Sequence, residues 1–493
     1  MPLKKGLGAV TCQPTSWPAN GRCSVRRTKI IATIGPSSRE AEVVRALLGA
    51  GVDVFRLNLA HEDLDAHERV LDTVRACVEE VGKTVAILAD LPGLKMRTGP
   101  VRGDAVGLKT GSDLVLTSHE REGDATRIST TVGTLSNLVS EGDEIFLADG
   151  QIVLRVASTG DGEVRTKVLR GGILRSRKGM HIPSAERSLE SFTEADRKPL
   201  DFVIRAGIDF VGLSFVRSPA DLIAVRDELP KRGPRPALVA KIETRAAVEE
   251  LDSVVDEADA VMVARGDLGI QLALSDVPLL QKRIIHTCNR AGKPVITATQ
   301  MLESMTRDPL PTRAEAADVA NAVLDGTDAL MLSEETAVGA YPVAAVKTMS
   351  DIAATADASP REHPSPSSRD MNGDRVSWAV AHAAVRASED LSVAAIVCPT
   401  RTGATPRRVA AFRPSMPIAA LADRAHEARM LALSWGVQPM LVPPPDPDAD
   451  DVRYAVAAVA RAGVVSAGDL VTVVAGAPGP RAGRTDFLRV VRV

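Results

Sequence analysis

Residues 238–267, LVAKIETRAAVEELDSVVDEADAVMVARGD, contain the pattern that decides the fold. Two short apolar runs, 238–242 and 260–264, flank a segment with helical patterning. A strand, a helix and a second strand in this order are typical of a parallel βαβ unit. Both runs are almost continuously apolar, which indicates strands that are covered on both faces.

The same unit recurs between residues 28 and 340. Six further apolar runs alternate with helical patterns, at residues 28–33, 54–59, 84–89, 210–215, 294–298 and 329–332. Eight parallel strands favour a closed barrel over an open sheet. The sequence therefore predicts an α/β fold, a (β/α)₈ TIM barrel.

A further domain is inserted into this barrel. About 120 residues separate the third run from the fourth, which is far more than one crossover helix needs. Asp149-Gly150 is a strong hairpin-turn signal, and four short strand patterns surround it, at residues 113–117, 144–148, 152–156 and 164–169. We predict a small β-barrel domain at residues 96–185 that stands over one end of the main barrel.

The pattern changes again after the eighth unit. Residues 358–374 are rich in Ser, Pro and charge, which indicates a linker. Beyond them, helices such as 378–391 alternate with strand patterns at 394–398, 418–421, 440–442 and 470–474. The predicted organisation is an N-terminal extension at 1–25, a barrel built from 26–95 and 186–357, the inserted domain at 96–185 and a C-terminal α/β domain at 358–493.

Composition and charge exclude several classes of function. The 493 residues carry a formal net charge of −3, which disfavours a nucleic-acid partner. No apolar run approaches the ~20 residues that cross a bilayer, and no signal-peptide pattern forms, so we expect neither a membrane span nor secretion. Five cysteines without metal-ligand spacing indicate free thiols in a reducing compartment, and hence a cytoplasmic protein.

Polar residues collect where the predicted barrel strands end. In a (β/α)₈ enzyme the loops at these ends converge on one mouth, which holds the chemistry. Side chains two positions apart on a strand share a face, so the first and last residues of Lys241-Ile242-Glu243 and of Arg265-Gly266-Asp267 are expected to point the same way. One such pair alone is usually a solvated ion pair. Six strand ends together favour an active site, and their polar residues are Arg56, Asn58, Asp90, Lys241, Glu243, Arg265, Asp267, Thr299, Gln300, Ser333, Glu334 and Glu335.

Two of these residues suit a magnesium ion. Glu243 and Asp267 come from adjacent strands, and Mg²⁺ (or Mn²⁺) takes one or two protein carboxylates while water and substrate phosphate fill its other positions. The strand ends offer none of the His and Cys ligands that zinc prefers. Arg56 and Lys241 beside such a cation form the positive clamp that phosphoryl transfer needs.

Longer motifs identify a family. The quoted stretches are TKIIATIGPSS from Thr28, RLN from Arg56, KIET from Lys241, MVARGDLGI from Met262, GKPVITATQMLESM from Gly292, PTRAEAADVANAVLDGTDALMLS from Pro311, and ETAVGAYP from Glu335. With these motifs the chain resembles the pyruvate kinases over nearly its whole length. The resemblance implies transfer of the phosphoryl group of phosphoenolpyruvate to ADP, giving pyruvate and ATP. It also implies a lid role for the inserted domain, a regulatory C-terminal domain and a homotetramer.

The resemblance also implies a role for each site residue. The implied roles are Mg²⁺ ligation for Glu243 and Asp267; phosphoryl contact for Lys241; phosphate and nucleotide contact for Arg56 and Asn58; binding of the substrate carboxylate for Thr299 and the Gly266 amide; proton delivery for Thr299 and Ser333; and nucleotide contact for Arg97 and Lys178. Asp267 is placed beside the substrate as well as the metal.

A threonine-rich turn in the C-terminal domain has two interpretations. The segment TRTGAT lies between a predicted strand and a helix expected to start near Pro406. Hydroxyls and backbone N–H groups at a helix N-terminus bind phosphate, and the family resemblance implies a sugar-phosphate activator here. The alternative is an ordinary helix cap. The residues concerned are Thr400, Arg401, Thr402, Gly403 and Thr405.

Three departures from the family pattern affect one feature, the monovalent cation site. Ala60 and Leu91 replace residues that supply oxygens, and Lys95 replaces a glutamate. Asn58 and Asp90 remain of that site. We expect the Lys95 ammonium to replace the cation, so that K⁺ is not required; the alternative is that Lys95 points into solvent. A fourth departure, Glu334 in place of a frequent glycine, is expected to face solvent.

Two other functions share much of this pattern. A Mg²⁺-dependent aldolase or lyase acting on an enolate would use the same barrel and the same Glu and Asp pair, but it has no need of an inserted lid. A catalytically silent paralogue would be expected to have lost part of the set formed by Lys241, Glu243, Asp267, Thr299 and Ser333, and all five are present.

Overall fold

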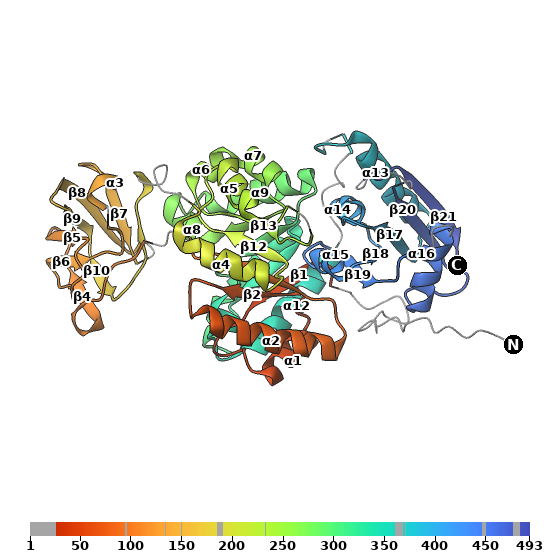
Figure 1. Cartoon of the computed structure of the whole chain (residues 1–493), viewed down its shortest axis with the longest axis horizontal. Helices are drawn as coiled ribbons and strands as arrows, with labels where there is room; N and C mark the ends of the chain where they lie inside the picture. The colour runs from red at the N-terminus through yellow and green to blue at the C-terminus, as the bar shows by residue number, and fades with distance from the viewer. Residues whose placement is uncertain are drawn as a thin grey trace.

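The computed structural model of the chain describes residues 26–93, 96–133, 135–148, 150–184, 191–231, 233–359, 368–369, 371–445, 450–476 and 484–493. The predicted extension at 1–25, Lys95 and Asp149 lie outside the described residues. Three units follow one another along the long axis (Figure 1): the inserted domain, the barrel, and the C-terminal domain on the opposite side of the barrel. Among the helices described, none has both the length and the apolar character needed to span a membrane.

Eight parallel strands form the closed barrel, in the order β1-β16-β15-β14-β13-β12-β3-β2. The strands are β1 (Lys29–Thr33), β2 (Val54–Asn58), β3 (Ala86–Asp90), β12 (Phe210–Leu213), β13 (Ala237–Ile242), β14 (Ala260–Ala264), β15 (Val295–Ala298) and β16 (Ala329–Leu332). Each lies within two residues of a predicted run, so the TIM-barrel prediction is confirmed.

Helices cover the outside of the barrel. They are α1 (Ala41–Ala50), α2 (Leu64–Val81), α4 (Glu194–Arg205), α5 (Pro219–Glu228), α6 (Arg245–Glu249), α7 (Leu251–Glu257), α8 (Arg265–Gln271), α9 (Val277–Ala291), α10 (Arg313–Leu324), α11 (Glu334–Ala337) and α12 (Pro342–Ala358). The sequence fixes their ends locally. In α2, for example, the Asp63 side chain accepts from the Ala66 N–H at 2.7 Å, and Gly82 ends the helix at a φ of 69° that a side chain disfavours.

The interior of the barrel is filled by alternate strand residues. Ile31, Val239 and Met262 are among those that are fully buried there. Ala432 and Leu433 of the C-terminal domain belong to the same cluster and close the amino end of the barrel. The C-terminal domain therefore closes the barrel at the amino ends of the strands and leaves the carboxyl ends for the active site.

The inserted domain has two sheets. One runs β11-β7-β8-β9-β5-β6, the other pairs β10 with β4, and both share one apolar core. We predicted a small β-barrel. Among the described residues, the edges of the sheets are linked by single-residue bridges such as Thr98–Thr130, which lie beside the strands, and not by continuous ladders. The elements are η1 (Arg102–Asp104), β4 (Ala105–Leu108), β5 (Asp113–Thr117), β6 (Arg127–Ser129), α3 (Leu135–Leu138), β7 (Glu144–Leu147), β8 (Ile152–Gly160), β9 (Glu163–Arg170), β10 (Gly172–Arg175) and β11 (Met180–His181).

The C-terminal domain has a five-stranded sheet in the order β19-β18-β17-β20-β21 with helices on both faces. Its elements are α13 (Arg375–Asp390), β17 (Ala395–Thr400), α14 (Ala404–Ala411), β18 (Ile418–Ala422), α15 (Ala425–Met430), β19 (Val437–Leu441), α16 (Asp451–Arg461), β20 (Leu470–Ala475) and β21 (Phe487–Arg492). The sequence analysis missed β21, an antiparallel edge strand that does not follow the βα alternation.

Buried polar contacts join this domain to the barrel. Arg413 pairs with Asp328 at 2.9 Å, and both side chains are less than a tenth exposed. Arg429 pairs with Asp209 at 2.8 Å, and the Lys29 ammonium donates to the Val437 carbonyl at 2.7 Å. Such buried pairs hold the amino ends of the barrel strands against the C-terminal domain.

Candidate active site

A buried network of charge lies at the carboxyl ends of β2, β3 and β13. The Lys241 ammonium lies 2.8 Å from Glu243 Oε1 and 3.6 Å from Asp90 Oδ2, and it donates to Ser214 Oγ at 2.8 Å. Arg56 donates to Asp90 Oδ2 from Nε at 3.0 Å and from Nη2 at 2.8 Å. The prediction that Lys241 and Glu243 share a strand face agrees with this geometry.

The charges in this network set one another's protonation. Burial acts to lower the pKa of Lys241, but the Glu243 and Asp90 carboxylates outweigh it and raise that pKa above its ordinary value. Burial acts to raise the pKa of Asp90, yet Arg56 and Lys241 bring it below the usual value. For Glu243, burial prevails and raises the pKa in spite of Lys241. Lys241 therefore remains a full positive charge at neutral pH.

Glu243 and Asp267 fit a divalent cation. Glu243 is 1% exposed, and its Oε2 accepts from the Phe215 N–H at 2.7 Å. Its Oε1 is buried, and the partner that the described residues give it is the Lys241 ammonium at 2.8 Å. Asp267 is near enough to raise the pKa of Glu243. Each oxygen of a carboxylate has two lone pairs, so a buried carboxylate with one contact at each oxygen keeps lone pairs for a cation. The described residues contain no group of three or more His, Cys, Asp or Glu placed for a metal, and Mg²⁺ needs only one or two carboxylates.

Asp267 reaches this place from a helix, not from a strand. α8 begins at Arg265 directly after β14, so the prediction that Arg265 and Asp267 share a strand face is wrong. Residues two apart on a helix do not face each other. Arg265 instead turns toward the neighbouring loop, where it donates to the Thr299 carbonyl and to Asp318, each at 2.7 Å.

Thr299 and Gly266 lie together, as the sequence analysis expects of a carboxylate-binding pair. The Gly266 N–H donates to Thr299 Oγ1 at 2.8 Å, and that hydroxyl donates to the Ala298 carbonyl at 2.6 Å. Thr299 and Gln300 have φ values of 66° and 54°. Non-glycine residues in this region cost about 1–3 kcal/mol each and occur where function constrains the backbone. Arg265 helps to hold this turn through the carbonyls it contacts.

Ser333 is fixed by a buried carboxylate that the sequence analysis left without a role. Glu335 is 2% exposed and accepts from the Ser333 N–H at 2.7 Å and from the Leu302 N–H at 3.1 Å. It therefore ties the end of β16 to the loop that follows β15. Burial raises the pKa of Glu335 against these two hydrogen bonds. Glu334 beside it is exposed, in agreement with the expectation that it faces solvent.

The two predicted nucleotide contacts lie side by side at the base of the inserted domain. Arg97 bridges to Gly179, and the Thr98 N–H donates to the Lys178 carbonyl at 2.9 Å. The Arg97 guanidinium donates to the Arg177 carbonyl at 3.1 Å, while Lys178 is exposed. Segments 80 residues apart are thus joined where the domain leaves and re-enters the barrel.

The structure describes only some of the residues at the place where we expect Lys95 to replace the monovalent cation. Lys95 lies outside the described residues. Asn58 and Asp90 are adjacent in register, and Asn58 Oδ1 accepts from the Ala60 N–H at 3.3 Å. Leu91 is 1% exposed and packs in the apolar core, so its side chain brings no oxygen to this region.

Ser214 and Thr33 also belong to the network and were missed. Ser214 accepts from Lys241, and Thr33 Oγ1 accepts from Arg56 Nη1 at 3.1 Å. Both lie at the carboxyl end of a barrel strand, and that position was the available signal. Thr299 and Ser333 were singled out at other strand ends, but these two hydroxyls were not.

The C-terminal turn is shorter than predicted. β17 continues to Thr400, and α14 begins at Ala404 rather than near Pro406. Gly403 has a φ of 75°, in the left-handed region that favours glycine. The Gly403 N–H donates to Thr400 Oγ1 at 2.9 Å, and Thr405 Oγ1 pairs with Thr485 at 2.8 Å. Arg401 and Thr402 are exposed.

Comparison with known proteins identifies the family of the chain. Residues 25–346 match the pyruvate kinase barrel domain, and residues 378–491 match the pyruvate kinase alpha/beta domain. Pyruvate kinase of Geobacillus stearothermophilus is 43% identical over 473 residues, which cover 94% of this chain and 80% of the relative. Pyruvate kinase of Thermococcus litoralis is 41% identical over 473 residues, 95% of this chain and 98% of the relative. Pyruvate kinase 2 of Synechocystis is 41% identical over 469 residues, 94% and 79% of the two chains. The chain therefore belongs to the pyruvate kinase family of phosphotransferases.

Proposed function

We propose that the protein transfers the phosphoryl group of phosphoenolpyruvate to ADP with the help of Mg²⁺ or Mn²⁺ held by Glu243 and Asp267. The observation that carries the proposal is the buried Lys241, kept charged by Glu243 and Asp90 at the mouth of the barrel. A divalent ion bound there would neutralise phosphate charge and fix the substrate oxygens.

Lys241 stabilises the charge that spreads over the oxygens of the phosphoryl group as its bond to the enol oxygen breaks and its bond to ADP forms. Arg56 supports it. Its Nε–H and one N–H of each terminal nitrogen bond Asp90 and Thr33, which leaves the second N–H of each terminal nitrogen for phosphate. Asn58 completes the phosphate contacts. Arg97 and Lys178 hold the nucleotide from the base of the inserted domain.

The second half of the reaction is protonation of the enolate at its methylene carbon. We assign the substrate carboxylate to the Thr299 hydroxyl and the Gly266 N–H, which would exchange their present acceptors, the Ala298 carbonyl and Thr299 Oγ1, for the carboxylate oxygens. We assign the proton path to Thr299 and Ser333. The strained turn at Thr299 and the bond from the Ser333 N–H to Glu335 support this assignment, because both fix the backbone that carries a hydroxyl.

The proposal has regulatory, structural and cellular parts. The turn formed by Thr400, Arg401, Thr402, Gly403 and Thr405 receives a phosphorylated effector. Exposed apolar side chains on the barrel, Leu274, Leu279 and Leu310, support association of subunits into a homotetramer.

The compartment is proposed from the cysteines. Cys77, Cys288 and Cys398 are buried free thiols, which suits a reducing, cytoplasmic compartment. The role in glycolysis is proposed from the reaction.

We further propose that catalysis needs no K⁺. Ala60 and Leu91 supply no side-chain oxygen, and Asp90 Oδ2 is already bonded by Arg56, so that Asp90 Oδ1 is the one oxygen of this carboxylate without a hydrogen bond among the described residues. The Lys95 ammonium would carry the remaining positive charge.

The direct test is ATP formation from phosphoenolpyruvate and ADP by the purified full-length chain with Mg²⁺. Loss of activity on chelation and its recovery with Mg²⁺ or Mn²⁺ are expected. Absence of ATP, together with cleavage or condensation of a keto acid, would favour a lyase instead. Absence of both would favour a silent paralogue.

A further inference from the structure

A strained turn follows β12 and contacts the candidate metal site. Phe215 has a φ of 54°, in the left-handed region that residues with a β-carbon rarely adopt. Its N–H donates to Glu243 Oε2 at 2.7 Å, and the hydroxyl of the preceding Ser214 accepts from Lys241 at 2.8 Å. The turn formed by residues 214–216 therefore touches both the proposed metal ligand and the lysine that is proposed to contact the phosphoryl group.

Two buried hydroxyls hold this turn in place. Backbone strain of this kind persists only where other contacts fix the chain. The Phe215 carbonyl accepts from the Ser191 hydroxyl at 2.7 Å, and the next carbonyl, that of Val216, accepts from the Thr244 hydroxyl at 2.7 Å. Ser191 and Thr244 are 3% and 1% exposed. Consecutive carbonyls of the turn are thus held from two different segments of the chain.

The two hydroxyls come from different parts of the fold. Thr244 directly follows Glu243 and caps α6 by accepting from the Ala247 N–H at 3.0 Å, so it belongs to the segment that carries the metal ligand. Ser191 lies where the chain has returned from the inserted domain, just before α4. Ser191 therefore places a constraint on the turn that is independent of the Glu243 segment.

The segment that leads into the inserted domain packs against the same turn. A Cβ at Gly93 would lie 3.1 Å from the Ser214 Cβ and 3.5 Å from the Phe215 ring, so the backbone at Gly93 is in close contact with the turn. The Gly93 N–H donates at 2.8 Å to Asp196, which is fully buried in the first turn of α4. Both connections to the inserted domain are therefore fixed beside the turn, and Ser191 lies on the second of them.

We infer that Ser191 is a positioning residue for the metal ligand Glu243. The Ser191 hydroxyl fixes the Phe215 carbonyl, and the left-handed backbone of Phe215 directs its N–H at Glu243 Oε2. That hydrogen bond orients the carboxylate and leaves it lone pairs for a cation. The inference rests on the proposed function, because it takes Glu243 to be a ligand of Mg²⁺ or Mn²⁺. Ser191 acts through Phe215 and is not itself a ligand.

Loss of the hydroxyl should loosen this arrangement. Without it, the Phe215 carbonyl loses its donor, and the turn can relax toward an ordinary backbone conformation. The Phe215 N–H then turns away from Glu243. The carboxylate loses the contact that orients it, while Lys241 still lies 2.8 Å from its other oxygen. A cation at Glu243 is therefore expected to bind more weakly.

The test is Mn²⁺ binding to the full-length protein, measured by electron paramagnetic resonance in the absence of phosphoenolpyruvate and ADP. Loss of a hydrogen-bond partner of a metal ligand typically weakens metal binding about 10–100-fold. Ser191 contacts that partner and not the ligand, so Ser191→Ala should weaken Mn²⁺ binding less, about threefold to tenfold. Ser191→Thr keeps the hydroxyl and should bind Mn²⁺ within about twofold of the wild type.

Ser388→Ala is the matched control. Ser388 is fully buried in the C-terminal domain, and its hydroxyl donates to the Ala384 carbonyl at 2.6 Å. This variant also removes a buried hydroxyl from a carbonyl, so it should lower stability in denaturant unfolding and leave Mn²⁺ affinity unchanged.

A second variant tests whether the strained backbone carries the effect. Phe215→Gly removes the β-carbon that makes a positive φ unfavourable, so the turn no longer needs the Ser191 hydroxyl to hold it. Adding Ser191→Ala to Phe215→Gly should therefore weaken Mn²⁺ binding less than about twofold, compared with Phe215→Gly alone.

Two outcomes would overturn the inference alone. One is that Ser191→Ala binds Mn²⁺ as tightly as the wild type. The other is that Ser191→Ala weakens binding equally with Phe215 and with glycine at that position, because the hydroxyl would then not act through the strained turn. Glu243→Gln tests the proposed metal site itself and should weaken Mn²⁺ binding about a hundredfold. If Glu243→Gln bound Mn²⁺ normally, the metal site of the proposed function would be wrong, and the role of Ser191 with it.

Discussion

The two ends of the barrel each bury a lysine among ionised neighbours, with opposite results. At the carboxyl end, Lys241 lies beside Asp90 and Glu243, and Arg56 is the other cation that the described residues bring to the network. At the amino end, Lys29 lies among Asp53, Arg26 and Lys83. Arg26 pairs with Asp53 at 2.8 Å and Lys83 lies 3.7 Å from it.

The difference lies in the balance of neighbouring charge. Burial acts to lower the pKa of both lysines. At Lys241, the Glu243, Asp90 and Asp267 carboxylates face a single cation and raise the pKa, whereas at Lys29 two cations, Arg26 and Lys83, oppose Asp53 and Asp357 and the pKa falls to about 8. The carboxyl end thus keeps a permanent cation beside an excess of carboxylates, as phosphoryl transfer with a divalent ion requires. The amino end serves as a joint, where Lys29 bonds the Val437 carbonyl.

The largest expected effect is a loss of turnover when the lysine at the carboxyl end, Lys241, is replaced. Lys241→Met keeps much of the side-chain volume and removes the charge, so turnover should fall roughly a thousandfold or more through lost transition-state stabilisation. The matched control is Lys29→Met, the same change at the other end, which should retain turnover within about threefold. Steady-state rates and circular dichroism of both variants are the measurements. If Lys241→Met kept more than about a tenth of wild-type turnover, Lys241 would not be the main group that stabilises the transition state.

At the amino end, the lowered pKa of Lys29 predicts how the free energy of unfolding depends on pH. Lys29 has a pKa of about 8 in the folded protein and 10.5 as its ordinary value. Between these values the unfolded chain binds more protons, so the Lys29 contribution makes stability rise with pH, by at most about 3 kcal/mol over this window. The stability of the wild type relative to Lys29→Met should therefore increase from pH 8 to pH 10.5. Denaturant unfolding at several pH values measures it, and a constant difference would show that Lys29 stays protonated throughout.

Glu335 is a positioning residue whose loss should cost less than that of Lys241. Glu335→Ala removes the acceptor for the Ser333 and Leu302 N–H groups, and we expect kcat to fall about thirtyfold while the KM for phosphoenolpyruvate changes less than about threefold. Glu335→Gln keeps one carbonyl acceptor and should recover part of the loss. A purely structural role would instead lower the melting temperature and leave kcat per folded molecule unchanged in both variants.

The smallest expected effect is that of removing K⁺. The carboxyl end already holds Arg56 and Lys241, so replacing K⁺ by a tetraalkylammonium salt at equal ionic strength should change the initial rate less than about threefold. A fall beyond about tenfold would contradict the proposal. Lys95→Glu should impair the enzyme without creating a strong K⁺ response, because Ala60 and Leu91 still bring no side-chain oxygen.

Much of the site was predictable because parallel strands end at one edge. The positions of Lys241, Glu243 and Thr299 follow from the apolar runs that precede them. The direction of the Arg265 side chain could not be predicted in this way, because β14 ends at Ala264 and a helix begins at Arg265. Ser214 and Thr33 were missed although they lie at strand ends, because no charged residue stands two positions away from either and their partners, Lys241 and Arg56, come from other strands.

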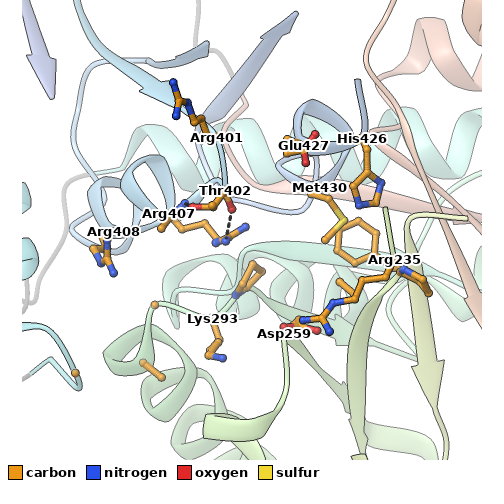
Figure 2. A pocket seen from close by; sticks show the side chains of 18 of the residues that line it. Arg235, Asp259, Lys293, Arg401, Thr402, Arg407, Arg408, His426, Glu427 and Met430 are labelled. Carbon is orange, nitrogen blue, oxygen red and sulfur yellow. Dashed lines mark hydrogen bonds between the residues drawn. The ribbon is translucent and has the colours of Figure 1, made fainter. Parts of the chain in front are cut away.

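The sequence by itself determined the eight βα units, the inserted and C-terminal domains and the family, because periodicity and long motifs are properties of the local chain. Only the tertiary structure decided which charges meet. It placed Asp90 against both Arg56 and Lys241, and it tied Ser333 to the neighbouring loop through Glu335. It also formed a cavity of about 620 Å³ between the barrel and the C-terminal domain from segments that are more than 100 residues apart, such as those of Arg235 and Arg407 (Figure 2). Charge balance depends on distances between strands, and these are fixed only when the barrel closes.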